Sequence, residues 1–457
     1  MTTSHSSDTI CALSTAPGVG AIAVIRVSGK QAFTSLETIF SKDLTSATSH
    51  TSHFGRIRTA DGNTIDEVLV TILHEGQSFT GEATVEIACH GSLYIQQQIL
   101  QLLVENGCRM AEPGEFTMRA FLNGRMDLSQ AEAVADLISS ESKRAHEVAM
   151  KQMRGGFSNE LKTLREKLIH FASLVELELD FAEEDVEFAD RTQLNQLIIE
   201  VLNYVIRLRQ SFALGNVLKN GVPVAIVGAP NTGKSTLLNQ LLGEERAIVS
   251  NIAGTTRDVI EETLNIEGIL FRLIDTAGIR EKAETIEAMG IERSFEKIKQ
   301  AHIVLLIADL SEPIIETTAT WASELAQQYP DKKLLIVGNK QDVLTSPIDW
   351  KNELSFLQIS AKTGQGINEL KNWLIEQILG DFDTQTDTIV TNARHVEALA
   401  KTEESLEKAK WGLETNVTGD FVAMDIRQAM FHLGTITGDI STEDLLGNIF
   451  SKFCIGK

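Results

Sequence analysis

Cysteine, proline and long apolar runs are all scarce in this sequence. Its 457 residues include four cysteines and seven prolines, and no two cysteines form a Cys-x-x-Cys pair. The cysteine pattern predicts reduced thiols in a cytosolic protein. No apolar run approaches the roughly 20 residues that a membrane-spanning helix needs, and the first ten residues lack the regions of a signal peptide. We therefore expect a cytoplasmic protein with no membrane association, and the lack of a basic, serine-rich leader favours a bacterial source.

Positive charge is also in short supply, with 41 lysines and arginines against 63 aspartates and glutamates and a net charge of -22. This balance argues against a protein that binds nucleic acid through a general basic surface, although a local basic patch or a basic partner stays possible. The densest acidic run, residues 176–190, holds eight carboxylates and no lysine or arginine. We interpret it as a solvated helix face, with a docking surface for a basic partner as the alternative.

What the sequence does contain is a phosphate-binding loop. Residues 228–235, with the sequence GAPNTGKS, fit the pattern G-x-x-x-x-G-K-[ST]. The apolar run 222–227 predicts a buried strand before the loop, and residues 236–242 predict a helix after it. In that setting backbone N–H groups surround a phosphate chain, and the helix N-terminus adds partial positive charge. Lys234 would reach the β- and γ-phosphates, and Ser235 would ligate Mg²⁺.

Two further motifs predict that the base is guanine. Residues 339–342, with the sequence NKQD, follow an apolar run, and the Asp342 carboxylate can accept hydrogen bonds from N1–H and N2–H₂ of guanine. Adenine lacks those donors, so it would leave a buried carboxylate without a partner. Ser360, Ala361 and Lys362 follow a short predicted strand and resemble the loop that offers a backbone N–H to the guanine O6.

A fourth motif, Asp275-Thr276-Ala277-Gly278, ends the predicted strand 271–274. Its aspartate would hold a Mg²⁺-bound water, and the N–H of its glycine would face the γ-phosphate. Because the motifs occur in GTPase order, residues 217–380 are predicted to form a GTPase domain. The next residue departs from the Ras pattern, since Ile279 stands where a glutamine orients the attacking water. Arg257 and Arg280 are the nearest arginines, and neither is obviously placed as a finger, so a cation or a dimer partner must complete the site.

The rest of the chain changes character at two places, and its length favours three domains. Residues 1–118 alternate strand and helix patterns. Long amphipathic helices follow, the clearest over 128–153 and 157–181, and helical patterns return at 394–410, 421–433 and 442–450. A GTPase fold needs its own closed sheet. We therefore predict a discontinuous helical domain, residues 119–216 and 381–457, with the GTPase domain inserted into it.

Six strings outside the phosphate loop resemble a known family. They are GAIAVIRVSG at 20–29, SFTGE at 78–82, PGEFTMRAFLNGR at 113–125, DLSQAEA at 127–133, IAGTTRD at 252–258 and CIGK at 454–457. Together they resemble the MnmE (TrmE) family of tRNA-modifying GTPases over essentially the whole chain. The resemblance implies a multidomain α/β protein with an N-terminal α+β folate-binding and dimerisation domain, a helical domain and a Ras-like P-loop GTPase domain.

The resemblance also implies a function and partners. Proteins of this family form homodimers and work with a flavin- and NADH-using subunit, MnmG, in a heterotetramer or larger complex that engages tRNA. Together they add an aminomethyl or carboxymethylaminomethyl group to C5 of the wobble uridine, with a tetrahydrofolate derivative as the carbon donor. GTP hydrolysis, with Mg²⁺ and K⁺ as cofactors, is coupled to K⁺-dependent pairing of two GTPase domains.

The family's site residues carry over onto matching positions. Its nucleotide contacts match Asn231, Thr232, Gly233, Lys234, Ser235, Thr236, Ser250, Thr255, Thr256, Asp275, Thr276, Ala277, Gly278, Asn339, Lys340, Asp342, Ser360, Ala361 and Lys362. Its Mg²⁺ ligands match Ser235 and Thr256, and its K⁺ ligands match Asn231, Ser250, Ile252 and Thr255. Its catalytic set matches Lys234, Thr256 and Glu287, the last orienting water indirectly.

The folate contacts implied by the resemblance are Arg26, Glu82, Arg125 and Lys457. Arg125 stands where many relatives have lysine, and the two side chains are not interchangeable in geometry. Taken alone, Arg26 also fits an edge residue of an apolar strand, and Glu287 also fits a helix cap. A second function stays open as well: a regulatory GTPase switch of the ribosome-assembly type, which the GTPase motifs alone do not separate from a tRNA-modifying enzyme.

Overall fold

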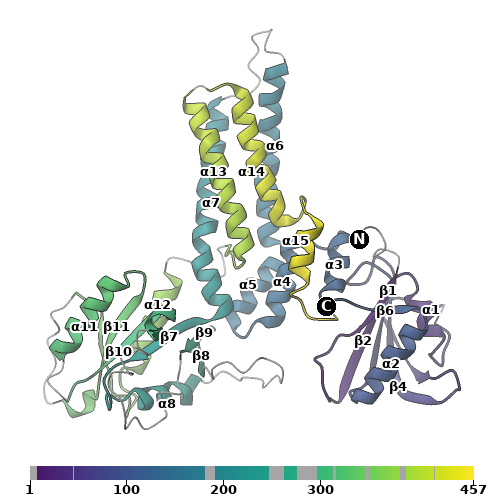
Figure 1. The fold of residues 1–457 in the computed structure, drawn as a ribbon, viewed down its shortest axis with the longest axis horizontal. Coiled ribbons are helices and arrows are strands. Elements are labelled where there is room, and N and C mark those ends of the chain that lie inside the picture. Colours follow the sequence, from purple (N-terminus) through teal and green to yellow (C-terminus); the bar gives the residue numbers. More distant parts are fainter. Residues whose placement is uncertain are drawn as a thin grey trace. The chain divides into compact units, whose positions relative to one another are not determined.

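The structure is a computed structural model that describes residues 8–44, 46–180, 191–245, 262–274, 296–311, 315–344, 350, 353–380, 388–415 and 417–456. Its contacts divide the chain into two compact units. The first contains residues 1–135, 152–188 and 423–457, and the second contains 136–151 and 189–422. Each unit has its own six-stranded sheet (Figure 1).

The sheet of the first unit is mixed, with strand order β3-β4-β5-β2-β1-β6. Strands β1 and β6 are parallel, and the other neighbours are antiparallel. The strands are β1 Thr9–Leu13, β2 Ile22–Ser28, β3 Thr51–Arg58, β4 Thr64–Leu73, β5 Thr84–His90 and β6 Cys108–Met110. The alternating strand and helix patterns predicted within residues 1–118 are therefore confirmed.

One face of this sheet carries the core. Alternate residues of β2, such as Ile25 and Val27, are buried, because successive side chains of a strand point to opposite faces. Helices α1 Ala32–Glu37 and α2 Leu93–Glu105 pack on that face through side chains such as Leu36 and Ile99. The other face carries the polar side chains of β2 that matter for the candidate site, including Arg26 and Ser28.

The first unit also contains helices α3 Glu115–Leu122, α6 Gly156–Asp180 and α15 Glu443–Phe450, the first part of α4 Leu128–Ser139 and most of α14 Gly419–Thr437. Leu128, Ala131 and Phe450 form a small core between α4 and α15. Thr442 caps α15, since its hydroxyl accepts a hydrogen bond from the amide of Leu445. The helix predicted over 442–450 is confirmed.

The prediction of one helix over 128–153 was wrong. The structure has two helices there, α4 and α5 Lys143–Met153, separated by a short break. The hydroxyl of Ser142 accepts a hydrogen bond from the amide of Ala145 at 3.2 Å, so it caps the start of α5. A run of polar residues, Ser139-Ser140-Glu141-Ser142, therefore ends one helix and starts the next.

The sheet of the second unit is parallel apart from β8, with strand order β12-β11-β10-β7-β9-β8. Its strands are β7 Val222–Val227, β8 Glu262–Ile266, β9 Ile269–Leu273, β10 Ile303–Asp309, β11 Lys333–Asn339 and β12 Phe356–Gln358. Its helices are α5, α7 Arg191–Asn220, α8 Lys234–Glu245, α11 Ile315–Gln328, the short η2 Gln341–Val343, α12 Ile367–Leu379 and α13 Ala393–Glu414.

Helices cover both faces of this sheet, so its central strands are apolar throughout. Every residue of β10 is buried. Leu305 and Ile307 belong to the core shared with α8 and α12, whereas Val304 and Leu306 belong to the core shared with α11. Because these strands are parallel to one another, the C-terminal ends of β7, β10, β11 and β12 lie along one edge.

Outside that sheet, the long helices α7 and α13 lie side by side (Figure 1). Arg209 of α7 pairs with Glu403 of α13 at 2.7 Å.

All four cysteines are free thiols, with Cys11, Cys89 and Cys108 buried and Cys454 exposed. Within the described part of the chain, no helix has both the length and the apolar character required to cross a membrane.

Candidate functional site

The phosphate-binding loop lies between β7 and α8, as the sequence predicts. Three of its residues have positive φ angles: Gly228 at +151°, Asn231 at +63° and Gly233 at +94°. A Cβ atom on Gly228 would come within 2.3 Å of the Ile307 carbonyl oxygen, so only glycine fits against β10 there. The loop leads directly into the N-terminus of α8, whose first amide groups have no partner within the helix. This arrangement suits a phosphate chain.

The side chain of Lys234 folds over this loop. Its ammonium donates hydrogen bonds to the carbonyls of Gly228 at 2.8 Å and Ala229 at 2.7 Å. Burial lowers the pKa of Lys234, and the neighbouring charge of Lys297 lowers it further. Ser235 and Thr236, which follow in the first turn of α8, are exposed. A hydroxyl at that place is a hard oxygen donor and therefore fits the chemistry of Mg²⁺.

Asn339 connects the phosphate loop to the predicted base-binding loops. From the end of β11, its Nδ2 donates to the carbonyl of Thr232 at 2.8 Å, and its Oδ1 accepts from the amide of Ala361 at 2.9 Å. A Cβ atom on Gly233 would lie 2.2 Å from Nδ2 of Asn339, so the asparagine packs directly on the loop backbone. The side chain thus fixes three loops relative to one another.

The remaining base-side residues pair with neighbours at the same edge of the sheet. The hydroxyl of Ser360 donates to the Asp342 carboxylate at 2.6 Å, and this hydrogen bond lowers the pKa of Asp342. Lys340, which has a φ of +68°, pairs with Asp309 at the end of β10. Burial raises the pKa of Asp309, but hydrogen bonds from Lys340 and Ser311 outweigh it, so the net shift is downward. The lowered pKa of Asp342 keeps its carboxylate ionised, so it can accept hydrogen bonds.

The predicted nucleotide-site residues that the structure describes lie close together. The residues from 231 to 236, 339 to 342 and 360 to 362 meet at the C-terminal edge of the parallel strands, where open α/β sheets bind ligands. The predicted site residues that lie outside the described ranges are Ser250, Ile252, Thr255, Thr256, Asp275, Thr276, Ala277, Gly278, Glu287 and Lys457.

A second polar site lies in the first unit. The guanidinium of Arg26 donates to Glu86 on the neighbouring strand at 2.8 Å and 3.0 Å, and it lies 5.8 Å and 5.7 Å from the ring centres of Phe79 and Phe116. Arg26 is therefore an ordered cation on an aromatic support. Glu82 lies on the loop before β5, where the buried hydroxyl of Ser28 donates to its carboxylate at 2.7 Å.

The other two predicted folate contacts also belong to this unit. Arg125 is exposed, and its side-chain stem packs near Gly81, next to Glu82. The C-terminal tail lies against the end of β1, where the Ser14 hydroxyl donates to the carbonyl of Gly456 at 3.1 Å. A Cβ atom on Gly456 would come 2.1 Å from the Leu13 carbonyl oxygen. The tail thus reaches the N-terminal sheet one residue before Lys457.

Sequence reasoning missed a charged network beside Glu82. Arg119 contacts Glu82, Asp8 and Glu115, and Arg109 contacts the last two. Burial raises the pKa of Glu115, but hydrogen bonds, first from Arg109, lower it more. The only signal in the sequence is the spacing of Glu115 and Arg119, which allows an i,i+4 pair on a helix.

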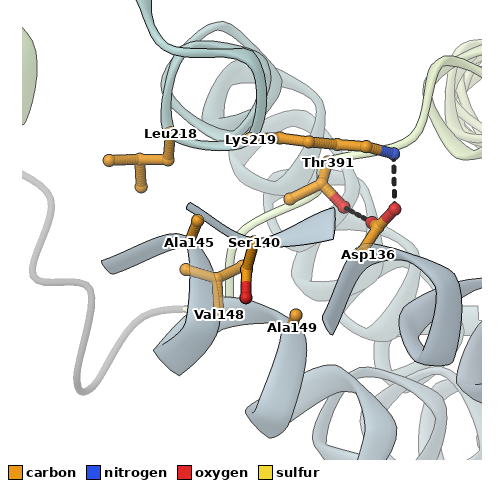
Figure 2. A pocket seen from close by; sticks show the side chains of 8 residues that line it. All are labelled: Asp136, Ser140, Ala145, Val148, Ala149, Leu218, Lys219 and Thr391. Carbon is orange, nitrogen blue, oxygen red and sulfur yellow. Dashed lines mark hydrogen bonds and ion pairs between the residues drawn. The ribbon is translucent and has the colours of Figure 1, made fainter. Parts of the chain in front are cut away.

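A third polar cluster lies elsewhere in the second unit, around a small cavity (Figure 2). Lys219, at the end of α7, pairs with Asp136 at 2.6 Å, and the Thr391 hydroxyl donates to the same carboxylate at 3.2 Å. Figure 2 shows these three side chains converging above the small residues Ala145 and Ala149 of α5. The cluster ties the ends of α4 and α7 together and holds none of the predicted site residues that the structure describes.

Comparisons with known proteins cover the whole chain. The family description "GTP-binding protein TrmE N-terminus" matches residues 9–125, and "MnmE helical domain" matches residues 128–454. A tRNA modification GTPase MnmE from Cytophaga hutchinsonii is 55% identical over 100% of this chain and 99% of its own length. The chain belongs to the MnmE family of tRNA modification GTPases. The MnmE protein of Flavobacterium johnsoniae is likewise 55% identical, over 98% of this chain and 99% of its own.

Membership of the MnmE family confirms the predicted fold class, a multidomain α/β protein with an N-terminal TrmE domain, a helical domain and a P-loop GTPase domain. It also confirms the enzyme class, a GTP hydrolase. The G domain of the FeoB iron transporter of T. maritima is similar to 34% of this chain, with 97% of that domain covered, 26% sequence identity and a TM-score of 0.26.

Proposed function

We propose that this chain is a K⁺-activated GTP hydrolase that modifies C5 of the tRNA wobble uridine together with a flavin-dependent partner subunit. The observation that carries the nucleotide site is the double hydrogen bond of Asn339, which joins the phosphate loop to the loops expected to contact guanine. A single rigid side chain thereby sets the distance between the phosphates and the base. In this proposal the N-terminal domain ends at residue 118, and the GTPase domain spans residues 217–380 between the two parts of the helical domain.

The residues of the nucleotide site take distinct roles in this proposal. The loop amides from residue 231 to 236 would bind the phosphates, with Lys234 neutralising the β- and γ-phosphates. Asp342 would accept hydrogen bonds from the guanine edge, and a backbone N–H of the loop that begins at Ser360 would face O6. Ser235 and Thr256 would hold Mg²⁺. When bound, the ion would neutralise negative charge on the phosphates.

Water activation needs a different solution from that of Ras. The side chain of Ile279 has no group that can hydrogen bond to water. We propose that Glu287 orients the nucleophile through a bridging water, and that K⁺ held by Asn231, Ser250, Ile252 and Thr255 supplies positive charge. Asn231 is exposed in the phosphate loop, with a φ of +63°, and is the one of these residues that the structure describes.

The N-terminal site fits a folate derivative, a ligand with a pterin donor edge and an anionic tail. The Glu82 carboxylate suits the pterin donors, and Arg26 suits acceptor oxygens. Arg125 and Lys457 would add positive charge for the anionic tail. This assignment is supported by the ordered, partly exposed state of Arg26 and Glu82 and by the docking of the C-terminal tail on the same unit.

The proposed homodimer forms through the N-terminal domain. Phe54 and Leu69 are 56% and 45% exposed and lie opposite each other on β3 and β4, on the sheet face that α1 and α2 leave open. Exposed apolar pairs of this kind support an association surface. The flavin- and NADH-using partner and tRNA would join the dimer in a larger complex.

One experiment separates this function from the alternative, a regulatory switch of the ribosome-assembly type. Wobble-position nucleosides of tRNA from a strain lacking this gene are measured by mass spectrometry. We expect the C5-modified uridine to disappear and to return when the wild-type gene is restored, but not when Lys234→Ala is supplied. Unchanged wobble uridine in the deletion strain would reject the proposal in favour of the switch.

A further inference from the structure

The main-chain and side-chain groups of Glu82 are held from several directions. Ser28 donates to Oε2 at 2.7 Å, and Nη1 of Arg119 lies 3.2 Å and 3.3 Å from the two carboxylate oxygens. The amide of Glu82 donates to the hydroxyl of Thr80 at 3.2 Å, and its carbonyl accepts from the hydroxyl of Ser78 at 2.6 Å. Glu82 therefore has little freedom to change its orientation.

Arg119 is itself fixed in place. Its Nη2 donates to Asp8 at 2.7 Å and to Glu115 at 2.9 Å, and its Nη1 donates to the Asp8 carbonyl at 2.9 Å. Arg109 binds both acids from the other side, at 2.8 Å and 2.6 Å. Only 4% of the Arg119 side chain is exposed. A rigid guanidinium therefore stands behind the Glu82 carboxylate.

Exposure differs sharply between Glu82 and its supports. The side chain of Glu82 is 18% exposed, whereas Ser28 is fully buried and Arg119 nearly so. A ligand can therefore reach the carboxylate but neither of the groups that hold it. A carboxylate offers about four lone-pair positions, and the contacts from Ser28 and Arg119 occupy three. One position on Oε1 is left for a donor of the ligand.

Stability alone is a poor explanation for such a network. Buried ion pairs lose hydration, and replacing them with apolar side chains is often neutral or stabilising. A preorganised acceptor, in contrast, gains affinity because the ligand need not order it on binding. We propose that Ser28 and Arg119 are positioning residues that orient the Glu82 carboxylate toward an N–H donor of the ligand, such as the 2-amino group of a pterin. This role rests on the proposed folate site.

Calorimetric titration of the full-length chain with 5-formyltetrahydrofolate tests the role. Ser28→Ala removes one oxygen, and Arg119→Lys keeps the charge but loses the planar guanidinium. We expect each to weaken binding about tenfold or more, the scale of one hydrogen bond to a charged group, while GTP affinity stays at the wild-type value. Ser35→Ala is the control, because Ser35 is a buried serine of the same unit on α1. It should bind like wild type.

A second ligand distinguishes positioning from general damage. An analogue without the 2-amino group lacks one donor for Glu82, so Ser28→Ala should cost this analogue much less affinity than it costs the parent folate. Equal losses for both ligands would assign Ser28 a merely structural role and overturn the proposal. Wild-type affinity in both variants would also overturn it and would leave the folate site standing. Failure of the wild-type chain to bind either ligand would reject the folate site, and the positioning role with it.

Discussion

Asn339 donates a buried hydrogen bond from Nδ2 to the carbonyl of Thr232 at 2.8 Å. The contact joins the end of β11 to the phosphate loop after β7, although β10 separates these two strands in the sheet. Because the same side chain also accepts from the amide of Ala361, it links the phosphate and base ends of the site. Nucleotide affinity should therefore depend on this link between the two loops.

Asn339→Asp should show this dependence. The change keeps the shape but replaces the Nδ2 donor with an oxygen that faces the Thr232 carbonyl. Loss of a buried hydrogen bond costs about 1–3 kcal/mol, so GTP affinity should fall roughly 5- to 150-fold. Fluorescence titration with a labelled GTP analogue measures it. Asn220→Asp is the control, since that amide makes only an exposed hydrogen bond to Asn216; equal losses in both variants would contradict the linking role.

Asp342→Asn should shift base preference from guanine toward xanthine. The carboxylate accepts from guanine donors, whereas an amide can donate to the C2 carbonyl of xanthine. Ser360 also donates to Asp342, and its hydroxyl can reorient toward the amide oxygen. GTP and XTP affinities measured side by side decide the matter. An unchanged ratio of the two affinities would remove Asp342 from the base site.

GTP hydrolysis should be faster in K⁺ than in Na⁺ at matched ionic strength. The Ile279 side chain provides no polar group, so a cation beside Asn231 would neutralise the charge that develops between the phosphates. An arginine finger in that role contributes about 10³–10⁵ in rate. Asn231→Ala should abolish the difference between the two salts in a steady-state assay of phosphate release. Equal turnover of the wild-type chain in both salts would count against the cation.

The strand and the helix that flank the phosphate loop were predictable because their signal in the sequence is local. The strand before Gly228 and the helix from Lys234 follow from apolar patterning, and parallel strands bring their C-terminal ends to one edge. The pairing of Asn339 with Thr232 follows from that topology only once the strand order is known. No pattern in the sequence states that β10 lies between β7 and β11.

The N-terminal site was less predictable, since its residues meet only through the tertiary structure. Asp8, Glu82 and Arg119 are far apart in the chain and carry no shared motif. Hydrophobic patterning in the sequence predicts that charged residues lie on the surface. Glu115 and Arg119 are buried instead, because they neutralise each other. The division of residues 128–153 into two helices was missed for a different reason: a serine cap is weaker than the apolar periodicity on either side.

The buried network predicts a pH dependence. The pKa of Glu115 is lowered in the folded chain, so its stabilisation is complete above the unfolded pKa of about 4.3 and is lost as the pH falls through the folded value. Glu115→Gln should lower the stability of the N-terminal unit by about 3 kcal/mol near pH 7. The melting-temperature gap to wild type, followed by calorimetry, should shrink below about pH 4 as the wild-type carboxyl takes up its proton.

Glu67→Gln is the matched control for this pH dependence. Glu67 pairs with Arg56 on an exposed face of the same sheet. Such pairs contribute about 0–1 kcal/mol, so this variant should melt close to wild type at every pH. A gap for Glu115→Gln that stays constant from pH 7 to pH 3 would show that the carboxylate charge is not what stabilises the unit.

The last prediction concerns the β8–β9 turn, which caps helix α5. The Gly268 carbonyl accepts from the Arg144 amide at 3.1 Å, and the Glu267 carbonyl accepts from Arg144 Nε at 3.2 Å. The turn thereby satisfies a donor that the first turn of a helix cannot satisfy internally. Gly268 has a φ of +82°, and a Cβ atom there would lie 3.0 Å from the Cβ of Lys143. Gly268→Ala should therefore strain the turn and push it away from α5.

Hydrogen exchange of the α5 amides in the full-length chain measures this effect. The lost cap and contact should cost about 1–2 kcal/mol of local stability, so exchange should accelerate roughly 5- to 30-fold. Gly62→Ala is a close control, because Gly62 has a φ of +83° in the β3–β4 hairpin and nothing within 4 Å of the added Cβ. It carries the same backbone strain without a docking contact, so α5 should exchange as in wild type. Wild-type exchange of α5 in Gly268→Ala would mean that the stability of the helix does not depend on this turn.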